Sequence, residues 1–223
     1  MNKVLILAVH PDDETLGCGG SLLKHKKKGD KIYWLIATSI KSEQGFKKDE
    51  IARRDKEIKS VANMYGFEAV KMLDIPTTQV KEFPKQEMVK SISTVFKAIK
   101  PNILYLPFNG DVHSDHKVIF EAAYSCTKTF RYPFLNKVLM METISETEFA
   151  PPTKDSVFVP NYFVDISEFI AKKIEIMKIF KNEIGRHPFP RSVKNIKTLA
   201  TFRGATAGFK YAESFMVLKE LSK

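Results

Sequence analysis

Blocks of apolar and amphipathic residues alternate along the first half of the chain and predict strands and helices in turn. Residues 4–9 form a continuous apolar run, typical of a strand that is buried on both faces of a parallel sheet. Pro11 has no N–H for a sheet ladder and ends this strand. Similar runs predict further strands at residues 31–38, 69–73 and 103–106. Helical spacing predicts helices at residues 15–28, 48–65, 84–99 and 117–128.

The ends of these elements carry recognisable signals. Gly66 follows the periodic segment 48–65 and is expected to end its helix, and Pro84 suits the first turn of the next one. Gly17, Gly19 and Gly20 lie near the start of the 15–28 helix, where glycine lowers helix stability. We therefore expect this helix to approach the sheet closely.

Strand–helix alternation of this kind predicts an α/β fold, with a doubly wound, Rossmann-like and mostly parallel sheet. The second half of the chain is less regular and is expected to bind substrate. It contains predicted strands at residues 138–143 and 157–164, a helix from an N-cap at 165–167 to 182, a helix at 193–204 and a closing segment at 212–218. No linker or repeat interrupts the sequence, so residues 1–223 are expected to form a single domain.

Composition narrows the class of protein. The 223 residues are 43% hydrophobic and 28% charged, as in an ordinary globular protein, and no apolar run approaches the length of a membrane span. Two cysteines and no signal peptide favour the reducing cytoplasm. The net charge of +10 favours anionic small molecules, whereas scattered lysines without interleaved aromatic residues argue against nucleic acid. The oligomeric state is not predictable from these features.

The first strand leads directly into His10-Pro11-Asp12-Asp13-Glu14. One imidazole and three carboxylates so close together need a compensating cation. A metal ion bound by His10 and Asp13 would provide it and would leave Asp12 as a base for a water molecule. A turn followed by an aspartate N-cap is the alternative interpretation of the same residues.

A second polar cluster, Pro107 to His116, follows the strand at 103–106. In the common doubly wound order the first and fourth strands flank the switch point, so their carboxyl ends are neighbours. His113 and His116, one helical turn apart, are therefore expected to face His10, Asp12 and Asp13. Two surface histidines on a loop are the simpler alternative.

These two clusters together resemble the motifs of the LmbE-like (PIG-L) N-deacetylases, which are zinc-dependent amidases acting on amino sugars. Further segments resemble the family branch found with bacterial surface-polysaccharide genes, so the resemblance extends over nearly the whole chain. They are Arg54 with Glu57 and Gly66, Val164-Asp165-Ile166, 187–192, Arg203-Gly204 and 211–215.

The resemblance implies a role for each residue of the two clusters. His10, Asp13 and His116 would bind Zn²⁺, and Asp12 would be the general base. His113 would be the acid or oxyanion donor, oriented by Asp115. A carboxylate beside His113 is expected to raise its pKa and keep it cationic near neutral pH.

The residues that contact substrate are indicated less directly by the sequence. Arg54 and Arg191 are candidate substrate contacts, because guanidinium forks suit anionic or hydroxylated ligands. An ion pair with Glu57, one helical turn away, is the alternative for Arg54. With the net charge, they predict an anionic N-acetylated sugar carried on a nucleotide or lipid phosphate, or as a glycan precursor. The chain departs from many relatives at Pro76-Thr77-Thr78-Gln79, where they have an aspartate, and at residues 145–149.

Two other functions fit parts of the sequence. Acidic clusters at switch points also serve metal-dependent phosphoesterases, although these usually hold two metal ions. A catalytically inactive module that binds a nucleotide or glycan is the second alternative. Released acetate, released phosphate or neither would distinguish the three.

Overall fold

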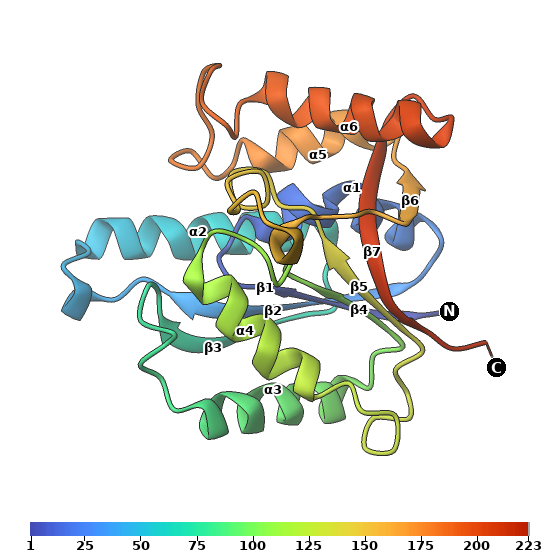
Figure 1. Ribbon diagram of the computed structural model, residues 1–223. Coiled ribbons are helices and arrows are strands. Elements are labelled where there is room, and N and C mark those ends of the chain that lie inside the picture. The colour runs from blue at the N-terminus through green and yellow to red at the C-terminus, as the bar shows by residue number, and fades with distance from the viewer. Residues whose placement is uncertain (223) are drawn as a thin grey trace.

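A seven-stranded sheet runs through the centre of the molecule, whose residues 1–222 are described by the computed structural model (Figure 1). The strand order is β3-β2-β1-β4-β5-β7-β6, in which β7 runs antiparallel to both β5 and β6 and the other described pairs are parallel. The strands are β1 (Lys3–Ala8), β2 (Lys31–Ser39), β3 (Ala69–Pro76), β4 (Ile103–Leu106), β5 (Lys137–Met141), β6 (Tyr162–Asp165) and β7 (Ala212–Glu220). The predicted α/β fold with a mostly parallel sheet is confirmed.

Helices cover both faces of the sheet (Figure 1). One face carries α1 (Asp13–Lys27), α2 (Lys48–Tyr65), α5 (Ile170–Met177) and α6 (Val193–Ala207), and the other carries α3 (Lys85–Ile99) and α4 (Ser114–Ser125). Short 3₁₀ helices lie at Ser42–Gln44 and Lys154–Ser156. Alternate side chains of β1 enter the two cores, Leu5 and Leu7 on the α3–α4 side and Val4 and Ile6 on the other. None of the helices described in residues 1–222 has the length and apolar character needed to cross a bilayer.

The predicted boundaries agree best in the first half of the chain. The helix at 48–65 and the strand at 103–106 have the predicted ends. In the second half, β6 contains only Tyr162–Asp165, not the whole predicted 157–164, and α5 stops at Met177 rather than at residue 182. Helix α4 begins at Ser114, three residues before the predicted start, because His113 caps it.

Helix α1 is kinked at Cys18, where φ is −145° and ψ is 20°. The kink frees the amides of Gly20 and Ser21, which donate to the two carboxylate oxygens of Glu213 at 2.7 Å each. The close approach predicted from the glycines is present, since a Cβ on Gly17 would lie 2.7 Å from the sulfur of Met141 in β5. This packing fixes the start of α1, and with it the residues that follow β1.

Candidate active site

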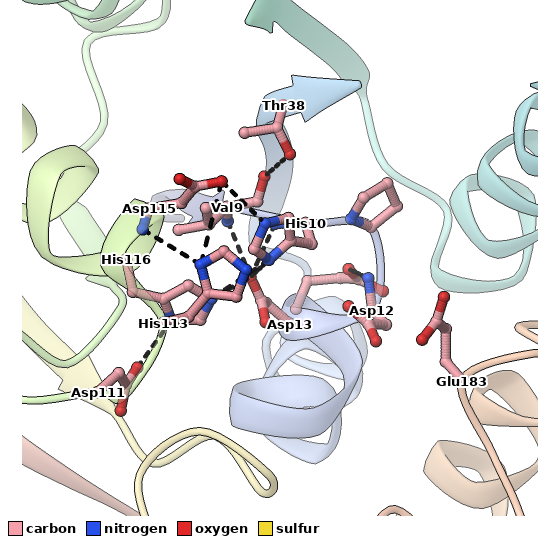
Figure 2. Close-up of polar contacts among 12 residues, drawn as sticks. Val9, His10, Asp12, Asp13, Thr38, Asp111, His113, Asp115, His116 and Glu183 are labelled. Atoms are coloured by element: carbon pink, nitrogen blue, oxygen red, sulfur yellow. Dashed lines mark hydrogen bonds and ion pairs between the residues drawn. The ribbon is translucent and has the colours of Figure 1, made fainter. Parts of the chain in front are cut away.

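The two polar clusters meet at one edge of the sheet. β1 and β4 are hydrogen-bonded neighbours, so the segments after them lie side by side, as the strand order predicted. His10 and Asp13 come from the β1–α1 junction, and His113 and His116 come from the start of α4. Figure 2 shows these imidazoles and carboxylates pointing toward one another.

Three of these side chains lie close enough together to bind one metal ion. His116 Nε2 lies 3.4 Å from His10 Nδ1 and 3.4 Å from Asp13 Oδ2, and the last two atoms are 4.0 Å apart. Zinc bonds of about 2.0–2.1 Å in a tetrahedron place neighbouring ligand atoms about 3.3–3.5 Å apart, so both separations from His116 match and the one between His10 and Asp13 is longer. The residues present therefore fit a divalent cation with three protein ligands and one open position.

Each ligand is held by a further contact. Asp111 Oδ2 lies 2.8 Å from His116 Nδ1, and its other oxygen accepts a hydrogen bond from Thr147 at 2.7 Å. The amides of Val9 and His10 donate to Asp13 Oδ2 at 2.9 and 2.8 Å. Burial lowers the pKa of His116, but Asp13 and then Asp111 outweigh it and raise that pKa to about 9 without a metal ion. A metal ion must therefore displace a proton from His116.

A second possible ligand set, His10, His113 and Asp115, shares His10 with the first. In this set, His113 Nδ1 accepts the amide of Asp115, and Asp115 Oδ2 accepts the amide of Thr78 at 2.7 Å. Since both sets need His10, the described residues form one metal position rather than the two typical of phosphoesterases.

Asp12 is buried in a backbone conformation that non-glycine residues rarely adopt, with φ at 152°. Its amide donates to Glu14 Oε2 at 3.0 Å, and Arg54 Nη1 donates to the preceding carbonyl, that of Pro11, at 3.1 Å. Burial raises the pKa of Asp12 well above its ordinary value, and neighbouring Asp13 adds to the effect. A carboxylate whose pKa is raised in this way has the proton affinity that a general base needs.

The pKa of His113 differs from the prediction. Burial and then His10 lower its pKa, and the smaller raising effect of Asp115 does not reverse this, so the expected cationic His113 is wrong for this structure. The amide of Asp115, not its carboxylate, contacts His113 Nδ1, at 3.2 Å. The Asp115 carboxylate lies nearer to His10 Nε2, at 3.5 Å, than to His113 Nδ1, at 4.0 Å. Because Nδ1 accepts the Asp115 amide, the neutral form of His113 carries its proton on Nε2.

Arg54 and Arg191 meet at a single carboxylate that the sequence interpretation did not include. Glu183, in the segment between α5 and α6, binds Arg54 Nη2 through Oε1 and Arg191 Nη2 through Oε2, the latter at 3.0 Å. Arg191 Nη1 also lies 3.6 Å from Asp12 Oδ2, and Arg54 Nε lies 3.5 Å from Glu57 Oε2. Figure 2 shows Glu183 beside Asp12, on the side away from the histidines.

A cavity of about 490 Å³ opens beside the metal ligands and contains both arginines in its wall. Six carboxylates and three guanidinium groups line it among the described residues, namely those of Asp12, Asp13, Glu50, Asp55, Glu146, Glu183, Arg53, Arg54 and Arg191. Its volume suits a ligand the size of a small saccharide or drug molecule.

The sequence interpretation gave no role to Asp111 or Glu183. Asp111 could have been found from its position before His116, because metal-binding histidines usually donate their second N–H to a carboxylate. Glu183 gave no local signal, since its partner Arg54 lies 129 positions away in the chain.

Comparisons with known proteins agree with the geometry. Residues 5–127 match the model of the family described as GlcNAc-PI de-N-acetylase (PIG-L), which is more than half of the chain. The chain belongs to this family and is an enzyme of the hydrolase class, as the resemblance implied. The deacetylase names of the relatives favour an enzyme over the inactive binding module.

Individual relatives are distant but cover most of the chain. The diacetylchitobiose deacetylase of Thermococcus kodakarensis is 25% identical over 96% of this chain and 82% of its own length. The uncharacterized deacetylase YaiS of Escherichia coli K12 is 24% identical over 80% of this chain and 90% of its own. The structure of the N,N'-diacetylchitobiose deacetylase of Pyrococcus horikoshii superimposes with a TM-score of 0.77 at 20% identity, covering 98% of this chain and 84% of that one.

Proposed function

We propose that this protein is a metal-dependent deacetylase that hydrolyses the N-acetyl group of an amino sugar to acetate and a free amine. The observation that carries the proposal is the placement of Asp12, a buried carboxylate with a raised pKa, directly between the metal ligands His10 and Asp13 in sequence and beside a cavity. A metal ligand set and a separate base are the two parts that amide hydrolysis by water requires.

Zinc is the cation that this ligand set favours, because two imidazoles, one carboxylate and an open fourth position are typical of catalytic zinc. His10 Nδ1, Asp13 Oδ2 and His116 Nε2 would hold it. When bound, such a cation acidifies the attacking water and polarises the amide carbonyl.

In this proposal Asp12 accepts a proton from the attacking water. Its strained backbone, fixed by Glu14 and by Arg54 on the Pro11 carbonyl, holds the carboxylate at the wall of the cavity. The protonated Asp12 can then deliver the same proton to the departing amine, which completes the proton balance without a second acid.

His113 acts as a neutral hydrogen-bond donor to the developing oxyanion. The Asp115 amide occupies Nδ1, so the ring proton is on Nε2, and the side chain lies in the cavity wall. A positioned donor of this kind stabilises an oxyanion without carrying a charge of its own.

The N-acetyl sugar as substrate rests on the family and on the activities named in the relatives, and the cavity volume agrees with it. The link to polysaccharide synthesis and the cytoplasmic location stay predictions from the sequence.

Acetate release after removal and return of the metal tests the proposal. The protein would be treated with a chelator, dialysed, and supplied with zinc, cobalt, manganese or magnesium in separate samples. N-acetylglucosamine and N,N'-diacetylchitobiose would serve as substrates, with a phosphate assay on glucosamine phosphates in parallel. Acetate that appears only with added metal supports the proposal. Metal-independent acetate release, or phosphate release alone, would overturn it.

A further inference from the structure

The two arginines of the cavity are occupied by contacts within the protein. Each oxygen of the Glu183 carboxylate binds one of them, Oε1 to Arg54 and Oε2 to Arg191. The remaining Nη1 groups face the Pro11 carbonyl, at 3.1 Å, and the Asp12 carboxylate, at 3.6 Å. Phosphate and carboxylate ligands are bound best by two parallel N–H groups of a free guanidinium fork. Neither Arg54 nor Arg191 therefore has two parallel N–H groups free to bind a ligand.

The charge of the cavity agrees with this geometry. Among the described lining residues, carboxylates outnumber guanidinium groups six to three. A divalent cation adds two positive charges, so the lining carries no net positive charge when all six carboxylates are ionised. The cavity therefore lacks the strong positive field that would favour a phosphate over an uncharged sugar.

The cavity also contains polar groups that need partners. Within the described part of the chain, a buried polar atom lacks a hydrogen-bond partner in five lining residues, which are Ser39, Thr143, Ser145, Glu146 and Arg191. Arg191 Nε is a donor, Glu146 Oε2 is an acceptor when ionised, and the three hydroxyls can be either. A buried polar atom without a hydrogen bond lowers the stability of the protein. The hydroxyl groups of a ligand can both donate to the acceptors and accept from the donors.

We infer that the sugar bound in this cavity is uncharged, and that Glu183 determines this specificity by occupying Arg54 and Arg191. The inference rests on the proposed function for the identity of the ligand as a sugar. It reverses the anionic acceptor predicted from the net charge, because that charge lies outside the cavity.

Kinetics on matched substrates test the inference. N-acetylglucosamine would be compared with its 1-phosphate and 6-phosphate in the zinc-loaded wild type, and kcat/KM for the neutral sugar should be at least about tenfold higher. In Glu183→Gln, the KM for the phosphorylated sugars should fall by about tenfold, the effect of one charge-assisted hydrogen bond. The KM for the neutral sugar should change less. Asp55→Asn is the matched control, because it removes a carboxylate from the same cavity without releasing an arginine.

A binding measurement separates this inference from the proposed function. Calorimetric titration of the zinc-loaded proteins with sulfate needs no turnover, and the metal contributes equally to each variant. Sulfate should bind Glu183→Gln about tenfold more tightly than the wild type, and Asp55→Asn should change the affinity by much less. Equal effects of the two variants would overturn the role of Glu183. A wild type that prefers phosphorylated sugars would overturn the uncharged ligand, even if Glu183→Gln fails to fold.

Discussion

The carboxylate of Asp111 lies 2.8 Å from His116 Nδ1, and both side chains are completely buried. This contact directs His116 Nε2 toward His10 and Asp13. Both residues follow β4, since Asp111 precedes α4 and His116 lies in its first turn. Loss of such a partner usually lowers metal affinity by about 10–100-fold.

Asp111→Asn should therefore lower zinc affinity by about 10–100-fold while the protein stays folded. Competition with a chromophoric chelator measures the affinity. Asp30→Asn is the control, because Asp30 makes the same 2.8 Å contact with His25, a histidine that is not among the metal ligands. If both variants bind zinc like the wild type, Asp111 does not support the site.

Metal binding should depend on pH through His116. In the metal-free protein its pKa is about 9, so below that pH the ring carries a proton that the metal must displace. Apparent zinc affinity should rise as the pH increases toward 9 and then level off. Calorimetry in buffers of different ionisation enthalpy should detect the released proton at pH 7.5. Binding without proton release would contradict the assignment of His116 as a ligand.

His113→Ala should retain zinc and lose turnover by about 10²–10³-fold, as for a lost oxyanion donor. Because the pKa of His113 is lowered, the wild-type ring is already neutral at and above pH 7. The pH–rate profile of the variant above pH 7 should therefore have the same shape as that of the wild type, and His113→Asn should recover part of the rate. A high-pH decline that disappears in His113→Ala would instead indicate a cationic His113.

The stability of the α1 kink should depend on Glu213. Its buried carboxylate accepts the amides of Gly20 and Ser21 and pairs with Lys173 at 2.8 Å. Removal of one partner of a buried ion pair typically costs about 3–5 kcal/mol, so Glu213→Ala should lower the unfolding free energy by that amount in urea.

Glu168→Ala is the control for Glu213→Ala. Glu168 pairs with Lys27 on the surface, where both side chains are more than half exposed. Its loss should change the unfolding free energy by less than about 1 kcal/mol. Similar effects of the two variants would show that Glu213 has no special role.

The parts of the fold that the sequence predicted well are those with a strong local pattern. The apolar run of β1 and the periodic helix α2 with Gly66 after it depend on neighbours in sequence. The early start of α4 was missed because His113 serves as its cap, and histidine is not a preferred N-cap residue. The predicted strand at 157–164 was too long, because β6 pairs with β7 only from Tyr162 onward.

The candidate site was likewise predicted from the sequence only in part. The meeting of His10, Asp13 and His116 followed from the strand order, which the alternation of elements predicts. The lowered pKa of His113 could not be predicted in this way, because it results from burial and the neighbouring His10, which outweigh the raising effect of the Asp115 carboxylate. Glu183 also depended on tertiary structure, since it reaches Arg54 and Arg191 from a segment without regular pattern.

The rate of acetate release by Asp12→Asn, measured with its zinc content, tests the central claim most directly. The amide of asparagine cannot accept a proton as the carboxylate does, whereas His10, Asp13 and His116 are unchanged. The account predicts about one zinc per chain and a rate lower by about 10²–10⁴-fold, as for a lost general base. A variant that keeps both its zinc and the wild-type rate would contradict the account.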